Sequence, residues 1–148
     1  MTSILLIQGP NLSYLGKREP EHYGTMTAAE LDAACRDHAR RRGYELDIFY
    51  THVEGFAIER IYKAVDEKKD ALVMNPAGMS YAGYAVRDCL KAVAPVLPYV
   101  EVHIRHIDNI GLHSVPVAAA RGSVFGFGAP LSYFLGLDAA LALVGHKG

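Results

Sequence analysis

The sequence contains 148 residues, of which 51% are hydrophobic and 21% are charged, and its formal net charge is -1. This size fits one domain over residues 1–148, since a chain of this length buries roughly two thirds of its unfolded surface. The composition excludes an intrinsically disordered chain, and the balanced charge excludes a positive field that attracts nucleic acid, so we expect small molecules or proteins as partners.

The first predicted elements are a strand and a helix. Residues 3–8 form a short apolar run before a Gly-Pro pair, which is typical of a strand buried on both faces. Thr27 and Glu30 have the spacing of a capping box, and apolar residues follow at helical intervals. A helix is therefore predicted over 27–42, with Gly43 ending it.

The rest of the chain continues this alternation. Residues 44–50 alternate as a strand, and Ile58, Ile61, Tyr62 and Val65 then mark one face of a helix. The remaining predicted elements are a strand at 71–74, a helix at 81–94, a strand at 98–103, a strand within 118–127 and a helix at 131–144. This order predicts a doubly wound parallel sheet with right-handed crossovers.

The connections after the strands are the places to search for a site, because ligands of such sheets bind beyond the carboxyl ends of the strands. These connections are unusually polar or rich in glycine, and they span residues 9–23, 51–55, 75–81 and 103–114. The first is too long for an ordinary connection between a strand and a helix. Two interpretations of it stay open: a solvated surface loop, or a lid that carries functional groups.

Membrane and secretory signals are missing from the sequence. No apolar run approaches the roughly 18 residues of a spanning helix, and the amino terminus has no signal-peptide pattern. Cys35 and Cys89 fall in helix-like segments without the spacing of metal ligands, so we expect buried, reduced thiols. The expectation is a cytoplasmic protein that makes no membrane contact.

The first connection reads GPNL at 9–12, LGKREP at 15–20 and YG at 23–24. This string resembles the amino-terminal signature of the type II 3-dehydroquinate dehydratases. The likeness continues in order at Glu54-Gly55, Asn75-Pro76, Arg87-Asp88, Glu101-Val102-His103, His113-Ser114 and Gly126-Phe127-Gly128. The resemblance implies a flavodoxin-like α/β sandwich with a five-stranded parallel sheet. It also implies a homo-oligomer based on trimers, with a dodecamer as the full assembly.

The chemistry implied by the resemblance is the dehydration of 3-dehydroquinate to 3-dehydroshikimate, without cofactor or metal, by anti elimination through an enolate. Tyr23 would be the base, and the Arg18 cation would favour its phenolate. Asn11 would hold a water against the developing enolate oxygen. His103 would protonate the departing hydroxyl, and Glu101, on the same face of the strand, would orient and charge the imidazole.

Further residues are implied to bind the substrate. Asn75 corresponds to an asparagine beside the histidine and the substrate carboxylate, and Ile104 and Arg105 stand where backbone N–H groups bind that carboxylate. Asp88 would reach the pocket of a neighbouring subunit. Tyr81 stands where the family has a substrate-binding histidine.

The sequence departs from the family pattern in the part of the site that holds the substrate ring. Besides Tyr81, Arg105 replaces a serine, His52 replaces an asparagine, and the segment 106–112 is shorter and contains no arginine. The missing histidine and arginine are those that hold the ring hydroxyls, whereas the base, its activator and the acid are present. We therefore expect the elimination chemistry to be kept and recognition to be altered, with 3-dehydroquinate or a related cyclic β-hydroxy ketone as substrate.

Other functions stay open at this point. The same base and enolate pocket suits an isomerase or cyclase in a specialised pathway, and an incomplete pocket suits a non-catalytic assembly or binding module. A nucleotide or flavin binder is a further alternative, although no G-x-G-x-x-G pattern follows the first strand.

Overall fold

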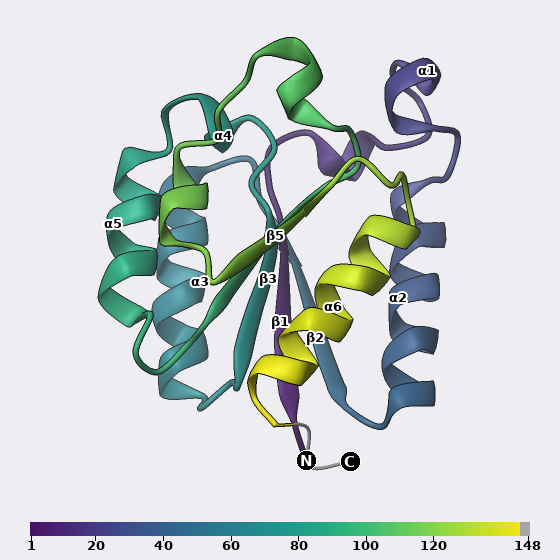
Figure 1. The fold of residues 1–148 in the computed structure, drawn as a ribbon. Coiled ribbons are helices and arrows are strands. Elements are labelled where there is room, and N and C mark those ends of the chain that lie inside the picture. The colour runs from purple at the N-terminus through teal and green to yellow at the C-terminus, as the bar shows by residue number, and fades with distance from the viewer. Residues whose placement is uncertain (146–148) are drawn as a thin grey trace.

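Five parallel strands form the central sheet of the computed structural model, which describes residues 1–145 (Figure 1). The strands are β1 (Ser3–Gln8), β2 (Glu45–Tyr50), β3 (Ala71–Asn75), β4 (Tyr99–His103) and β5 (Gly122–Phe125). Their order across the sheet is β2-β1-β3-β4-β5, and all neighbouring pairs are parallel. This is the flavodoxin-like order, so the expected doubly wound fold is confirmed.

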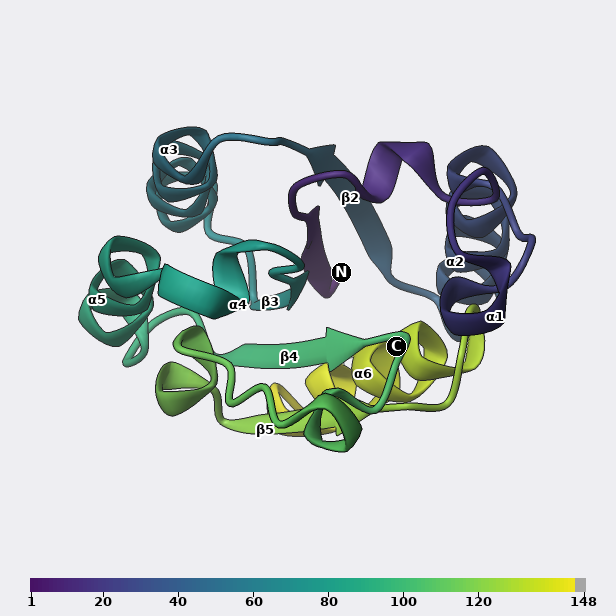
Figure 2. The same ribbon diagram turned by 90° about the horizontal axis from the view of Figure 1, so that it is seen from above.

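Helices cover both faces of the sheet (Figures 1 and 2). On one face lie α2 (Ala28–Arg42) and α6 (Leu131–Leu143), and on the other lie α3 (Glu54–Asp66) and α5 (Tyr84–Val93). The connections contain the short turns η1 (Leu12–Tyr14), α1 (Pro20–Tyr23), α4 (Met79–Ala82), η2 (Ile107–Ile110) and η3 (Pro116–Ala119). Within residues 1–145, no helix has the length and apolar character needed to cross a membrane.

Alternate residues of the strands pack into two hydrophobic cores, one on each face of the sheet. Leu6 of β1 lies in the core under α2 and α6 together with Cys35, whereas Ile7 lies in the core under α3 and α5 together with Cys89. Both cysteines are free and buried as expected, and burial raises the pKa of the Cys35 thiol to about 12. Each buried side chain of this size contributes about 1.5–3 kcal/mol, so the apolar run at 3–8 stabilises the packing on both faces of the sheet.

The capping box predicted for α2 is present. The Glu30 N–H donates to the Thr27 hydroxyl at 3.1 Å, and the Thr27 N–H donates to the Glu30 carboxylate at 3.1 Å. At the other end, Gly43 has φ 77° and ends the helix in the left-handed conformation that favours glycine.

Two predicted elements have different boundaries in the structure. The helix predicted at 81–94 is divided into α4 and α5 at Gly83, where a Cβ would lie 2.3 Å from the carbonyl oxygen of Met79. The strand predicted within 118–127 is shorter, because Pro116 begins the turn η3 and this turn packs against α5. The chain therefore enters β5 later than its apolar pattern suggests.

The buried face of α3 is narrower than predicted. Ile61 is fully buried between Ala57 and Ala64, whereas Tyr62, which was expected on the same face, is 47% exposed. The two alanines lie one turn before and one turn after Ile61, and their small side chains let the helix approach the sheet along this stripe. The prediction for Tyr62 was therefore wrong.

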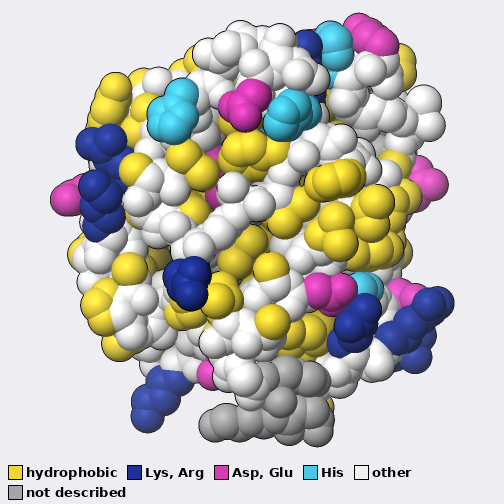
Figure 3. Space-filling view, in the orientation of Figure 1, with side chains coloured by type: hydrophobic (Ala, Val, Ile, Leu, Met, Phe, Trp, Pro, Cys, Tyr) yellow, Lys and Arg dark blue, Asp and Glu magenta, His cyan; other side chains and the backbone are white. Residues whose placement is uncertain are grey.

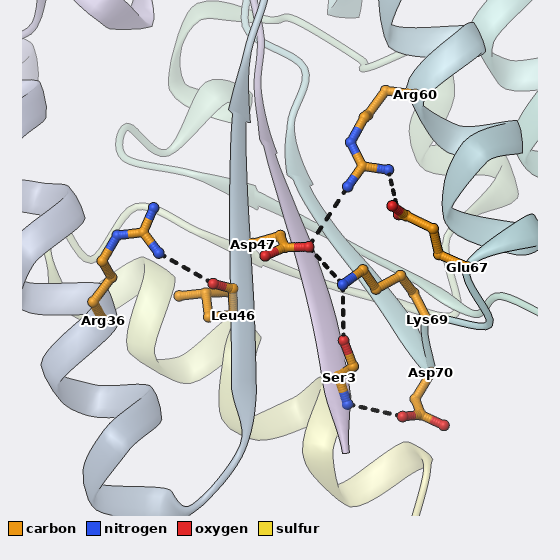
Figure 4. Close-up of polar contacts among 8 residues, drawn as sticks. All are labelled: Ser3, Arg36, Leu46, Asp47, Arg60, Glu67, Lys69 and Asp70. Carbon is orange, nitrogen blue, oxygen red and sulfur yellow. Dashed lines mark hydrogen bonds and ion pairs between the residues drawn. The ribbon is translucent and has the colours of Figure 1, made fainter. Parts of the chain in front are cut away.

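A polar network connects the strands towards their amino ends (Figure 4). The Asp47 carboxylate of β2 pairs with Lys69 at 2.5 Å and with Arg60 at 3.7 Å. Lys69 also donates to the Ser3 hydroxyl at 3.0 Å. The hydrogen bond from Lys69 is the main cause that lowers the pKa of the Asp47 carboxyl. The network thus joins β1, β2, α3 and the turn before β3.

Candidate active site

A cavity of about 230 Å³ lies at the carboxyl ends of β1, β3 and β4. Three of the four connections identified in the sequence supply its lining. The predicted site residues that line it are Asn11, Arg18, Tyr23, Asn75, Tyr81, His103, Ile104 and Arg105. The structure therefore brings together eight residues that come from three separate parts of the chain.

The long connection after β1 supplies part of the lining of this cavity. Leu12 and Leu15 are buried in the core and anchor it, and the turns η1 and α1 lie beyond the end of the sheet (Figures 1 and 2). This connection is called the lid, after one of the two interpretations left open by the sequence, and it contributes Arg18 and Tyr23 to the cavity.

Two contacts fix the start of this lid. A Cβ at Gly9 would lie 2.5 Å from the carbonyl oxygen of Pro76, so only glycine allows the connections after β1 and β3 to approach so closely. Two residues later, the Asn11 N–H donates to Nδ1 of His52 at 3.0 Å, with Asn11 in the left-handed region at φ 70°. His52 therefore supports the backbone of a cavity residue from the connection after β2.

The Arg18 guanidinium lies over the ring of Tyr23, 4.8 Å from the ring centroid. Arg18 also pairs with the Glu19 carboxylate at 3.1 Å, and about a third of the Arg18 side chain is exposed. The tyrosine ring is half-buried and packs against the core below it. This arrangement keeps a cation next to a tyrosine that lines the cavity.

Glu101 and His103 form a buried pair on β4. The carboxylate of Glu101 is 0% exposed and contacts Nε2 of His103 at 2.9 Å. Its other oxygen accepts a hydrogen bond from the Tyr99 hydroxyl at 2.6 Å. The ring of Phe125 packs edge-on against His103, with 4.8 Å between centroids. The imidazole is therefore held by a carboxylate behind it and an aromatic ring beside it.

Asn75, at the end of β3, is held on both ends of its amide. Its Oδ1 accepts from the Ala77 N–H at 3.0 Å, and its Nδ2 donates to the Tyr133 hydroxyl at 3.0 Å. The Tyr133 hydroxyl in turn donates to Oε1 of Gln8 at 2.8 Å. Burial raises the pKa of Tyr133, so its hydroxyl keeps the proton that this chain of hydrogen bonds requires.

The remaining lining of the cavity is largely apolar. Ile107, Ile110 and Leu112 come from the segment 106–112 after β4, which contains no arginine. Tyr81 lines the cavity with 66% of its surface exposed. The two parts of the lining expected to hold ring hydroxyls therefore consist of an exposed tyrosine and of apolar side chains.

Two predicted residues do not line the cavity. Glu101 lies behind His103, in agreement with its expected indirect role, and Asp88 is exposed on α5. Sequence reasoning missed Tyr99 and Tyr133, which hold Glu101 and Asn75. The alternation of β4 was a signal for Tyr99, since it stands two residues before Glu101; nothing local pointed to Tyr133, which is 58 residues from Asn75.

Within residues 1–145, no group of three or more His, Cys, Asp or Glu side chains has the arrangement of a metal site.

The family described as dehydroquinase class II matches residues 2–141. A 3-dehydroquinate dehydratase of Syntrophotalea carbinolica is 39% identical over 147 residues, which cover 97% of each chain. The crystal structure of a type II dehydroquinase from Butyrivibrio crossotus superposes with a TM-score of 0.89 at 29% identity, over 94% of this chain and 97% of that one. For the type II dehydroquinase from Propionibacterium acnes, the TM-score is 0.82 at 34% identity, over 97% and 95% of the two chains.

Proposed function

Because the chain belongs to the class II dehydroquinase family, we propose that it dehydrates 3-dehydroquinate or a closely related cyclic β-hydroxy ketone. One observation carries this proposal. A tyrosine next to a guanidinium and a histidine paired with a buried carboxylate line the same cavity of about 230 Å³. The first pair suits a base and the second suits an acid, which are the two groups that an elimination of water requires.

The reaction divides into two proton transfers. The Tyr23 phenolate removes a proton from the carbon next to the ketone, and the electron pair moves onto the ketone oxygen to give an enolate. His103 then donates a proton to the departing hydroxyl. The enolate returns to the ketone, its carbon–carbon double-bond electrons form the new double bond, the carbon–oxygen bond breaks, and water leaves. Asn11 supports the intermediate by holding a water against the enolate oxygen.

The orientation of His103 suits its role as the acid. Its Nε2 engages Glu101, so Nδ1 is the ring nitrogen that remains for the substrate. The buried Glu101 carboxylate is the group that pairs with this imidazole when the ring carries a proton to donate. Asn75 and the backbone N–H groups of Ile104 and Arg105 would hold the substrate carboxylate beside this ring.

Recognition of the ring hydroxyls is the weak part of the site. The apolar Ile110 and Leu112 lie on the side from which the family supplies an arginine, and Tyr81 cannot offer the charge of an imidazolium. A site built to bind hydroxyls loses affinity when its polar partners are removed. We therefore infer that 3-dehydroquinate is accepted with low efficiency.

The comparisons favour a lyase over the other candidate functions. The relative from Syntrophotalea carbinolica is a 3-dehydroquinate dehydratase, and both solved structures are type II dehydroquinases. An isomerase or cyclase, a non-catalytic module and a nucleotide binder have no comparable support.

The test is the appearance of enone absorbance when the purified protein is mixed with 3-dehydroquinate. We expect product formation above the rate in buffer, and loss of this activity in His103→Ala. No product at any substrate concentration would contradict the assignment of 3-dehydroquinate as substrate.

The chain is also inferred to work as a homo-oligomer based on trimers, in the cytoplasm. Apolar side chains gather on the surface over α6 (Figure 3), and Leu131 and Leu135 of that helix are exposed together with Phe127 before it. Asp88 is exposed on α5, where it is available to the pocket of another subunit. Light scattering should give the mass of a trimer or a dodecamer, and a monomer at micromolar concentration would contradict this inference.

A further inference from the structure

Three residues of β4 point to the same side of the sheet and form one line of hydrogen bonds. Tyr99, Glu101 and His103 alternate along the strand, and none of them is more than 5% exposed. The Tyr99 hydroxyl donates to Oε1 of Glu101 at 2.6 Å, and Oε2 of Glu101 contacts His103 at 2.9 Å. Both carboxylate oxygens therefore have a partner, one of them a phenol.

The surroundings of Glu101 supply little other charge. In the sheet, Glu101 stands opposite Met74 and Ser123, and the turn η3 has no ionisable side chain. The thiol of Cys89 comes from α5, and burial raises its pKa. Within residues 1–145, the ion pair of Glu101 is the one with His103.

On the cavity side, other ionisable groups lie near His103 itself. Tyr23, Arg18 and Arg105 line the same cavity as the imidazole. These groups act on His103 from the substrate's side, whereas Tyr99 acts on Glu101 from inside the protein. A change at Tyr99 can therefore be separated from a change in the cavity.

We propose that Tyr99 is a positioning residue of this active site: its hydroxyl keeps Glu101 ionised and directed at His103, so that the carboxylate holds the imidazole that donates the catalytic proton. This inference rests on the role proposed above for His103 as the acid.

The physical reason is that Glu101 pairs with the imidazolium and orients it only while the carboxylate is ionised. At acidic pH the carboxylate takes up a proton, and the imidazolium is left beside a neutral carboxyl group. Burial disfavours the charged arrangement, because both ions lose their water. A hydrogen bond donated to the carboxylate favours it, and such bonds to ions are about twice as strong as neutral ones.

Tyr99 is suited to this task because it can act only as a donor here. It is fully buried beside a carboxylate, and burial, followed by the charge of Glu101, raises its pKa well above the usual range. The phenol therefore stays protonated wherever the enzyme is active.

The test is the pH dependence of kcat/KM in Tyr99→Phe. Without the phenol, Glu101 should take up a proton more readily, so the acidic limb of the profile should move to higher pH by about one pH unit or more. We expect kcat to fall while KM changes little, since Tyr99 does not touch the cavity. A loss of activity by the same factor at every pH would overturn the proposal.

Tyr50→Phe is the matched control. Tyr50 also lies on a strand and its hydroxyl also donates to a carboxylate, that of Asp32 at 2.8 Å, but neither residue lines the cavity. The control should keep the wild-type pH profile. If it moved the acidic limb as far as Tyr99→Phe does, the effect would not belong to Tyr99.

A second variant keeps the test independent of folding defects. Incorporation of 3-fluorotyrosine at position 99 preserves the shape of the ring and makes the hydroxyl a stronger donor, so the acidic limb should move to lower pH. A shift to higher pH or no shift would count against the proposal.

A spectroscopic titration separates this inference from the proposed function. Infrared difference spectra of the Glu101 carboxyl, assigned with Glu101→Gln, should show protonation at higher pH in Tyr99→Phe than in wild type. This measurement needs no substrate, so it decides on Tyr99 even if the protein fails to dehydrate 3-dehydroquinate. Identical titrations in both proteins would overturn the inference.

Discussion

The Tyr133 hydroxyl accepts a hydrogen bond from the side-chain amide of Asn75 at 3.0 Å, directly below the cavity. Because the same hydroxyl donates to Gln8, the amide of Asn75 cannot rotate without breaking a chain of buried contacts. An α6 residue therefore determines how the side-chain amide of a β3 residue is oriented beside the cavity.

Tyr133→Phe should lower both stability and kcat/KM. The polar groups of Asn75 and Gln8 would lose a buried partner, so we expect the free energy of unfolding in urea to fall by about 1–3 kcal/mol. The decisive measurement is a double-mutant cycle with Asn75→Ala. If Tyr133 acts through Asn75, its substitution should reduce kcat/KM in the wild-type background and have little effect on the Asn75→Ala background. Additive losses would mean that Tyr133 is only structural.

Tyr23→Phe should abolish turnover and leave binding nearly intact. Removal of a positioned base typically reduces the rate by 10²–10⁴-fold. Tyr14→Phe is the control on the same lid, since Tyr14 is exposed and does not line the cavity. Retention of more than about a tenth of wild-type kcat in Tyr23→Phe would exclude this tyrosine as the base.

The altered ring pocket leads to a prediction about specificity. Two lost hydrogen bonds, at about 1–3 kcal/mol each, would place kcat/KM for 3-dehydroquinate roughly 30-fold to more than 10⁴-fold below an intact family site. Tyr81→His should recover part of this loss, because the segment with Ile110 and Leu112 still supplies no arginine. Unchanged kinetics in a well-folded Tyr81→His protein would show that Tyr81 does not face the substrate ring.

Stability at acidic pH should depend on Asp47. Its pKa is lowered in the folded protein, chiefly by the hydrogen bond from Lys69, so its contribution is present above the unfolded value of about 3.9 and is lost as pH falls through the folded value. Urea unfolding of Asp47→Asn should therefore differ from wild type at pH 7 and converge with it below about pH 4. The difference should be under about 1 kcal/mol and should shrink in salt, since the carboxylate is half-exposed. A gap that widened in acid would contradict the role of Lys69.

Much of the fold and part of the site can be predicted from the sequence for identifiable reasons. The apolar run of β1 and the Thr27–Glu30 capping box are local patterns, and both agree with the structure. The division of the helix at Gly83 could not be predicted, because it depends on the carbonyl oxygen of Met79 and on packing. Tyr133 was missed for a different reason: its partners are far away in sequence, and α6 is apolar nearly all round.

The two free cysteines allow one to measure how readily each pair of helices separates from the sheet. Cys35 lies under the α2 and α6 layer, and Cys89 lies under the α3 and α5 layer. With the pKa of Cys35 raised to about 12 and its side chain out of contact with water, an alkylating reagent reaches it only after its layer separates from the sheet. The labelling rates of the two thiols, followed by mass spectrometry, therefore give the opening free energies of the two faces separately.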